Sequence, residues 1–209
     1  MARKTKEEAL RTRQMLLNAA VEQFALHGVS STTLTDIADA AGVTRGAVYW
    51  HFASKSELFN AMWQEQQPLR ELLHHQVKPL EGENPLENLR NKFIVGLQYI
   101  AENPRQRALM QILYHKCEFS SEMISEAEIR RKIGFNYEYM RDNLQLCIRN
   151  GVLPVDSNIE IILIILHSAF SGIIKNWLMD PQQFDLYQQA PLLVDNVMAT
   201  FCPSLRCST

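Results

Sequence analysis

The sequence lacks any segment that would take the chain into or across a membrane. Its first residues, MARKTKEEA, have no apolar core of the kind found in a secretory signal. No run approaches the roughly 20 consecutive apolar residues that a membrane span requires. We therefore expect a cytoplasmic protein without a membrane partner.

Metal-binding motifs are also missing. The cysteines, Cys117, Cys147, Cys202 and Cys207, include no CxxC pair, which argues against structural zinc. His115 lies two residues before Cys117, and on a helix residues at that spacing point in different directions. Cys202 and Cys207 could approach one another, but reduced thiols fit a reducing compartment better. We expect no metal site.

A catalytic constellation is the third absence. The serines have no evident histidine and acid partner, and the histidines are scattered along the chain. Asp36 and Asp39 share one face of a predicted helix, where acidic residues are more simply explained by the helix dipole than by acid and base chemistry. We expect no enzymatic activity and no cofactor.

Charge, by contrast, is present but unevenly distributed. The formal net charge is −2, whereas residues 1–13 contain five basic and two acidic side chains, a balance of +3 that leaves −5 for the remainder. A basic end on an acidic body suits a protein that touches phosphate with one face only. The alternative interpretation is a solvated, disordered terminus.

The stretch from Thr33 to Phe52, TLTDIADAAGVTRGAVYWHF, has the pattern of a helix-turn-helix. Thr33 and Asp36 have the spacing of a capping box and open a first helix, which Gly42 ends. Thr44 caps the second helix. Helical spacing turns Val48 and Phe52 inward and places on or near the outward side Arg45, Ala47, Tyr49 and His51. The same spacing would let Trp50 pack against the first helix; the alternative is that Trp50 contacts DNA.

The segment TLTDIADAAGVTRGAVYWHFASKSELF resembles the signature of TetR-family transcriptional repressors. The likeness is closest to the AcrR-type subgroup, which controls multidrug efflux genes, and it extends to MARKTK at the start and LYHKCEF at residues 113–119. This resemblance implies a repressor that binds a double-stranded DNA operator. In the family, the start of the recognition helix, the Tyr of the YxHF segment and the Lys that opens the next helix touch DNA. The candidate DNA contacts are Thr33, Thr44, Arg45, Ala47, Tyr49, His51 and Lys55.

The whole chain is predicted to be all-α. An N-terminal three-helix unit within residues 1–53 would bind DNA, and a linking helix that starts after Ser54 would join it to a helical ligand-binding and dimerisation domain over residues 54–209. Pro68 should kink or break this linking helix near Gln67, because proline removes a backbone donor and clashes with the preceding turn. Further helices are predicted to start after Asn84, after Asn103 and at Ser120 or Ser121, the last of these running to Asn150.

The apolar segment 158–179 indicates that the protein forms a dimer. It is apolar around most of its circumference, so that one side can pack on the body and another on a partner. Because it carries Glu160, His167 and Lys175, we do not interpret it as a membrane span. In the family the last two helices of each subunit form a four-helix dimer interface. Two recognition helices related by a twofold axis would read a palindromic site; the alternative is a thick monomeric core.

Large, deformable side chains in the body could line a cavity for a ligand. Resemblance to efflux-gene repressors favours a small apolar or amphipathic ligand that releases the DNA, although the body has no obvious buried acid to bind a cation. The alternative is a DNA-binding regulator that is controlled by a protein partner. The candidate ligand-binding residues are Met62, Trp63, Gln67, Phe93, Arg107, Met110, Tyr114, Cys117, Tyr137 and Phe170.

Overall fold

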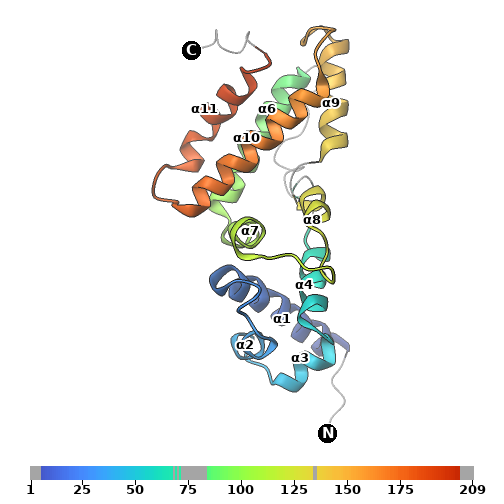
Figure 1. The fold of residues 1–209 in the computed structure, drawn as a ribbon, viewed down its shortest axis with the longest axis vertical. Coiled ribbons are helices and arrows are strands. Elements are labelled where there is room, and N and C mark those ends of the chain that lie inside the picture. Colours follow the sequence, from blue (N-terminus) through green and yellow to red (C-terminus); the bar gives the residue numbers. More distant parts are fainter. Residues whose placement is uncertain (1–5, 68, 70, 72–83, 134–135, 203–209) are drawn as a thin grey trace. The chain divides into compact units, whose positions relative to one another are not determined.

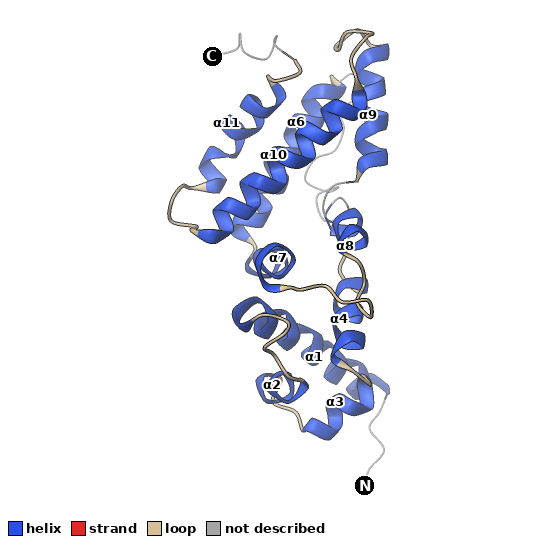
Figure 2. Ribbon diagram, viewed as in Figure 1, coloured by secondary structure: helices blue, strands red, loops and turns tan. Residues whose placement is uncertain are grey.

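The structure, a computed structural model, describes residues 6–67, 69, 71, 84–133 and 136–202. These residues form helices and connecting loops without a strand, so that the predicted all-α class is confirmed (Figure 2). The chain divides into two compact units. Unit 1 consists of residues 1–66 and 108–129, and unit 2 of residues 67–107 and 130–209.

Unit 1 contains the three predicted N-terminal helices and the start of the linking helix. These are α1 (Lys6–His27), α2 (Leu34–Ala40), α3 (Arg45–His51) and α4 (Lys55–Gln64), shown in blue to cyan in Figure 1. Helix α1 packs against α2 and α4, and α2 packs against α3. Gly28 ends α1 with a φ of 91°, a left-handed conformation that glycine adopts without a steric cost. The buried side chains between these helices include Phe24, Ile37, Val48, Phe52 and Phe59.

A second part of the chain completes unit 1. The π-helical turn η1 (Ile112–Lys116) packs against α1, and the Lys116 carbonyl accepts a 2.8 Å hydrogen bond from the Val29 N–H. Beyond it, the Asn60 amide of α4 donates to the Glu122 carbonyl at 3.0 Å and accepts from the Ile124 N–H at 2.6 Å. This unit therefore does not coincide with the predicted domain of residues 1–53, because α4 and residues 108–129 belong to it.

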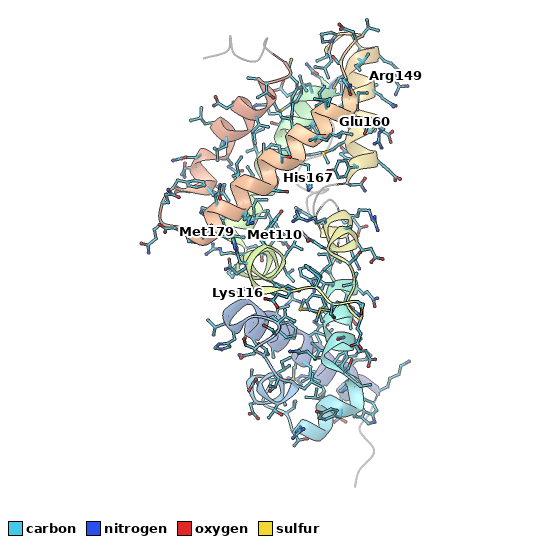
Figure 3. All side chains as sticks on the ribbon, viewed as in Figure 1. Met110, Lys116, Arg149, Glu160, His167 and Met179 are labelled. Carbon is cyan, nitrogen blue, oxygen red and sulfur yellow. The ribbon has the colours of Figure 1, made fainter. Side chains whose placement is uncertain are left out.

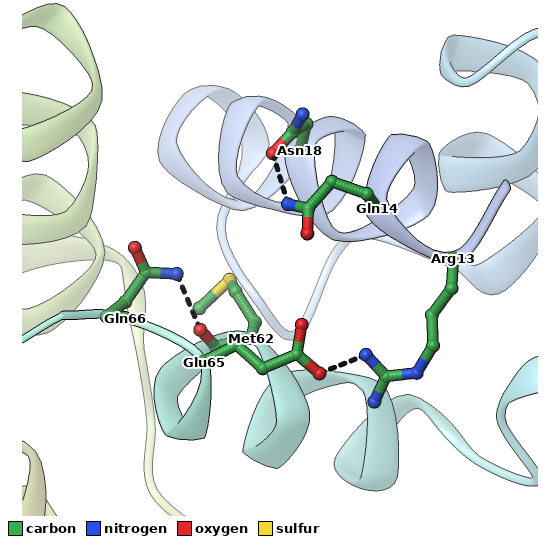
Figure 4. Close-up of polar contacts among 6 residues, drawn as sticks. All are labelled: Arg13, Gln14, Asn18, Met62, Glu65 and Gln66. Atoms are coloured by element: carbon green, nitrogen blue, oxygen red, sulfur yellow. Dashed lines mark hydrogen bonds and ion pairs between the residues drawn. The ribbon is translucent and has the colours of Figure 1, made fainter. Parts of the chain in front are cut away.

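An ion pair joins α1 to the end of α4. Arg13 of α1 pairs with the Glu65 carboxylate, and the Gln66 side chain caps α4 by donating 2.6 Å to the Met62 carbonyl (Figure 4). The Arg13 guanidinium also lies 5.0 Å from the centroid of the Phe52 ring. Arg13 is thus engaged inside the protein, although its charge belongs to the basic end of the chain.

Unit 2 is built around α6 (Pro85–Glu102), α9 (Tyr137–Arg149), α10 (Ile159–Met179) and α11 (Leu186–Met198). Helix α6 packs against α11 and α9, and α10 packs against both α9 and α11. Arg90 of α6 forms a two-pronged ion pair with Asp195 of α11, in which the Nη2 to Oδ2 distance is 2.8 Å. This pair fixes the register of the two helices that share the largest interface.

The linking helix ends at Gln64, three residues before Gln67, near which we predicted a kink or break; Pro68 lies outside the described residues. One predicted helix differs from the observed ones. The prediction of one helix from Ser120 or Ser121 to Asn150 is wrong. The chain forms α8 (Glu126–Ile133) and α9 instead, because Ser125 and Glu128 make the capping bonds that start α8 and the Asn136 side chain caps α9 by accepting from Tyr139 N–H at 2.9 Å. Asn103 does open α7 (Pro104–Gln111), as predicted.

Candidate DNA-binding surface and ligand-binding residues

The helix-turn-helix forms as the capping pattern predicts. The Thr33 hydroxyl accepts from the Asp36 N–H at 3.1 Å, and the Asp36 carboxylate accepts from the Thr33 N–H at 2.7 Å, which completes a capping box and lowers the pKa of Asp36. Gly42 turns the chain with a φ of 66°, and the Thr44 hydroxyl caps α3 by accepting from the Ala47 N–H at 3.2 Å. The hydroxyls of both predicted cap residues thus accept hydrogen bonds from backbone N–H groups in the first turn of each helix.

Helix α3 presents an open face away from the core. Val48 and Phe52 are buried, as predicted, while Arg45 and Tyr49 are exposed and Ala47 and His51 are half-buried. The expectation that Trp50 packs against the first helix is wrong, because 72% of this residue is exposed to solvent. Trp50 follows Val48 by two residues, and that spacing rotates its side chain by about 200°, to the opposite side of the helix.

Arg45 and Tyr49 form a local pair on this face. The Arg45 Nη2 donates to the Tyr49 hydroxyl at 3.4 Å, and its guanidinium lies 5.5 Å from the centroid of the Tyr49 ring. The hydrogen bond to Tyr49 raises the pKa of Arg45, so the cation is fixed in charge and restricted in position. A restrained guanidinium on an exposed helix suits a bidentate contact with guanine or phosphate.

Lys55 is engaged within unit 1. Its ammonium donates to the carbonyls of Val29 at 2.6 Å, Ser30 at 3.1 Å and Thr32 at 2.8 Å. An ammonium group has three N–H donors, so these bonds use all of them. Lys55 therefore ties the start of α4 to the turn between α1 and α2. Sequence reasoning missed this contact, although a cation at the first position of a helix opposes the helix dipole and signals a local partner.

The basic end of the chain is only partly described. Arg3 and Lys4 lie outside the described residues, Lys6 and Arg11 are exposed on α1, and Arg13 is engaged with Glu65. The predicted phosphate contact by this end stays a prediction.

The candidate ligand-binding residues fall into both units. Met62, Trp63 and Met110 are buried in unit 1, and Tyr114 and Cys117 are half-buried there. Burial, followed by the nearby Glu126 and Glu118, raises the pKa of the Cys117 thiol to about 11. The unit 2 members are Gln67, which is exposed, Phe93, Arg107 and Tyr137, which are half-buried, and Phe170, which is buried.

Aromatic contacts group the candidates of unit 2. The Phe93 and Phe170 rings stack with centroids 4.2 Å apart. The Tyr137 ring meets the ring of His167 edge-on, with centroids 5.5 Å apart. His167 lies on α10 (Figure 3). Burial raises the pKa of Tyr137; burial and then the charge of Arg130 lower the pKa of His167. At neutral pH both side chains are therefore uncharged.

Three buried side-chain donors have no hydrogen-bond partner within the described part of the chain. They are the indole Nε1 of Trp63, the amide Nε2 of Gln106 and the Nε of Arg107. Buried donors without acceptors are costly and uncommon in proteins. Sequence reasoning had not selected Gln106, which is polar but almost fully buried on α7.

Comparison with known proteins decides the family. The profile described as "Bacterial regulatory proteins, tetR family" matches residues 16–62, and that described as "MAATS-type transcriptional repressor, C-terminal region" matches residues 84–203. The chain belongs to the TetR family. The sequence-based resemblance is thereby confirmed, and the matched segments include the helix-turn-helix and most of the body.

The relatives of this TetR-family chain include regulators of efflux genes. An Escherichia coli (strain K12) protein described as "Probable acrEF/envCD operon repressor" is 55% identical over 203 residues, which cover 97% of this chain and 92% of that protein. Among solved structures, NalD, the secondary repressor of the MexAB-OprM multidrug efflux pump in Pseudomonas aeruginosa, has a TM-score of 0.75 and 32% identity, covering 94% of this chain and 98% of that chain.

A second similar solved structure is a complex with a small molecule. The SmeT–triclosan complex has a TM-score of 0.69 and 28% identity, and the match covers 92% of each chain. SmeT is described as the repressor of the Stenotrophomonas maltophilia multidrug efflux pump SmeDEF.

Proposed function

We propose that this chain is a cytoplasmic, sequence-specific transcriptional repressor of multidrug efflux genes, in which α3 reads a double-stranded operator. The observation that carries the proposal is an exposed helix-turn-helix in a TetR-family chain whose relatives are repressors of efflux operons. In this proposal Arg45 contacts a base edge, and Tyr49 and His51 contact phosphates. Thr33, Thr44 and Ala47 line the approach to the groove.

The repressor is proposed to act as a homodimer. One face of α10 packs inside unit 2, but Ile161 and Ile164 on another face are 51% and 56% exposed, and Leu192 of α11 is 63% exposed. By length and composition α10 could also cross a membrane. However, 33% of its most apolar 18-residue stretch is buried inside this chain, and the helix carries the charged residues Glu160 and Lys175. A second subunit that covers the apolar residues accounts for the exposure better.

Regulation is proposed to occur through a small apolar or amphipathic ligand. Its support is the triclosan in the complex of the similar protein SmeT and, within unit 1, the buried indole N–H of Trp63, which has no acceptor within the described residues. Helix α4 carries Trp63 and, through Lys55, holds the turn that precedes the helix-turn-helix. A ligand that binds more tightly to the DNA-free conformation would therefore release the operator.

The alternative is a regulator controlled by a protein partner. Thermal unfolding in the presence of a panel of apolar dyes separates the two proposals, because a ligand that binds only the folded state raises the unfolding midpoint. Fluorescence of Trp63 adds a local readout, with Trp63→Phe as the control that should lose any ligand-dependent quenching. A panel without stabilising compounds would favour the protein partner.

The DNA-binding proposal is tested by recovering genomic fragments. The purified protein is mixed with sheared genomic DNA of its source organism, and the retained fragments are sequenced and footprinted. We expect a palindromic site upstream of efflux genes, with half-sites about one helical turn, or 34 to 36 Å, apart. Retention of fragments without a shared sequence would refute sequence-specific recognition by this chain.

A further inference from the structure

Two of the three buried donors without an acceptor in the described part of the chain belong to consecutive residues of α7, both in unit 2. Gln106 is only 6% exposed, and neither its amide Nε2 nor the Nε of Arg107 has a partner there. Other polar groups at this helix start are engaged with one another. The Asn103 side chain accepts from the Gln106 N–H at 2.9 Å and donates to the Tyr99 hydroxyl at 3.0 Å. An acceptor from outside the described residues would satisfy both donors.

Arg107 also carries a charge that no carboxylate within the described residues neutralises. Its Nη2 donates to the Ala101 carbonyl near the end of α6, and its guanidinium carbon lies 5.2 Å from the centroid of the Trp177 ring. These contacts orient the side chain without cancelling its charge. A half-buried cation without a counterion is costly, and a planar guanidinium is well suited to hold a carboxylate through two parallel hydrogen bonds.

Trp177 belongs to an aromatic face of α10. Phe170 and Trp177 are seven residues apart, so they lie on the same face, separated by about 10 Å along the helix axis. Both are 4% exposed, and the Phe93 ring of α6 stacks on Phe170 with the planes at 20°. The Arg107 cation therefore lies at one end of an apolar surface that is about two helical turns long.

The charges on α10 favour an anion over a cation. Glu160 is the only acidic residue of this helix, and both of its carboxylate oxygens are paired with Arg141 of α9, at 2.9 and 3.0 Å. It also lies roughly 25 Å along the helix from Trp177. His167 is uncharged at neutral pH, because burial, and then the charge of Arg130, lower its pKa. A ligand cation would thus find no free carboxylate on α10.

We propose that unit 2 selects organic anions, with the ligand carboxylate held by Arg107 and Gln106 and the apolar part of the ligand lying along the α10 face from Trp177 to Phe170. The inference deepens the proposed regulation by a small ligand, because it assigns a charge to that ligand. The two oxygens of a carboxylate offer about four lone-pair sites, enough for both donors. A cation of the same shape would be repelled by Arg107 and would leave both donors unsatisfied.

Isothermal titration calorimetry of the full chain tests the charge selectivity with three probes of similar shape. They are the para-substituted biphenyl carboxylate, biphenyl carboxamide and biphenyl methylammonium. We expect the carboxylate to bind at least about 10-fold more tightly than the carboxamide, because its hydrogen bonds involve a charged group, and the ammonium to bind most weakly. Equal affinities for the carboxylate and the carboxamide, a preference for the ammonium, or binding of none of the three would overturn the inference.

Variants at two arginines of α7 locate the anion. Arg107→Met keeps much of the stem and removes the charge, so it should bind the carboxylate and the carboxamide about equally. Arg107→Lys keeps the charge without the planar fork and should retain a reduced preference for the carboxylate. Arg105→Met removes an equal charge from the same helix and is the matched control, which should keep the wild-type preference. A preference that survives Arg107→Met, or that Arg105→Met also abolishes, would overturn the assignment. The readout is a ratio between probes on one protein, so a general loss of stability does not imitate it.

Replacing Gln106 with Leu separates binding from folding. The variant loses an amide that has no partner for its N–H, so the free protein should unfold at the same temperature as the wild type or higher. Its affinity for the biphenyl carboxylate should nevertheless fall by about 10-fold or more, because a hydrogen bond to a charged group is lost. A lower unfolding midpoint together with unchanged carboxylate affinity would overturn the role of Gln106 in binding.

Operator release connects the anion to regulation. The biphenyl carboxylate should release the wild type from the duplex recovered from genomic DNA at a lower concentration than the carboxamide, and Arg107→Met should lose this difference. Selective binding of the carboxylate without operator release at saturation would support the anion site and refute the proposed regulation. Release by all three probes at equal concentrations would overturn the anion site and leave the proposed regulation in place.

Discussion

Replacing Lys55 with Met separates a structural role from a DNA contact. Met keeps most of the aliphatic stem but removes the ammonium that serves the carbonyls of Val29, Ser30 and Thr32. The bonds to Val29 and Thr32 are partly buried, whereas the one to Ser30 is exposed, so water can replace only the last. At about 1 to 2 kcal/mol for each partly buried bond, the variant should lose about 2 to 4 kcal/mol of unfolding free energy.

The assay is urea or thermal unfolding of the full chain, with Lys116→Met as the control. Lys116 donates to the Leu26 carbonyl near the same turn, but at 3.4 Å and in an exposed position, and its own carbonyl bond to Val29 survives the substitution. We expect this control to lose under about 0.5 kcal/mol. For Lys55→Met, unchanged stability combined with an equal loss of affinity for every DNA sequence would refute the structural role and establish a phosphate contact.

Three further predictions address other residues. Arg45→Ala should remove discrimination between operator and shuffled duplex in a gel shift, because a bidentate guanine contact contributes about 1 to 3 kcal/mol per half-site; equal losses for both duplexes would assign Arg45 to phosphate. Ile164→Lys should convert the proposed dimer to a monomer in sedimentation, whereas Val155→Lys, at an exposed loop position, should not; a dimeric Ile164→Lys would place the interface elsewhere. Burial is the main cause that raises the pKa of the Cys117 thiol to about 11, so only about 0.1% of it should be thiolate at pH 8. Iodoacetamide should therefore label Cys117 over about 100-fold more slowly than an ordinary cysteine. Rapid labelling would show that the thiol is accessible.

Much of the fold follows from short-range signals in the sequence. The capping pairs that start α2, α3, α4, α6 and α7 form as predicted, because each needs only a side chain and a backbone N–H two or three residues away. The predicted single helix after Ser121 failed for the same local reason. Ser125 and Asn136 cap two separate helices, α8 and α9. The apolar periodicity continues through both segments, and for that reason the sequence pattern did not reveal the break between them.

Contacts between distant segments were beyond the reach of local patterns. No spacing rule indicates that Asn60 binds residues 122 and 124, or that the Lys116 carbonyl meets Val29. These contacts attach residues 108–129 to the helices of unit 1, so a boundary drawn after residue 53 from sequence motifs cuts through one compact unit. The same holds for the candidate ligand-binding residues. The sequence gives the chemical type of each side chain, but it does not show which of these side chains are neighbours in space.

Trp50 shows how a correct pattern can give a wrong burial assignment. The prediction that helical spacing lets the indole pack against the first helix is wrong, because the angle from Val48 points the indole away from the core. Residue type and helical position therefore conflict at Trp50 within the sequence itself. In a helix of two turns, where one face must serve the core, an apolar residue on the opposite face is better interpreted as a binding residue than as a displaced core residue.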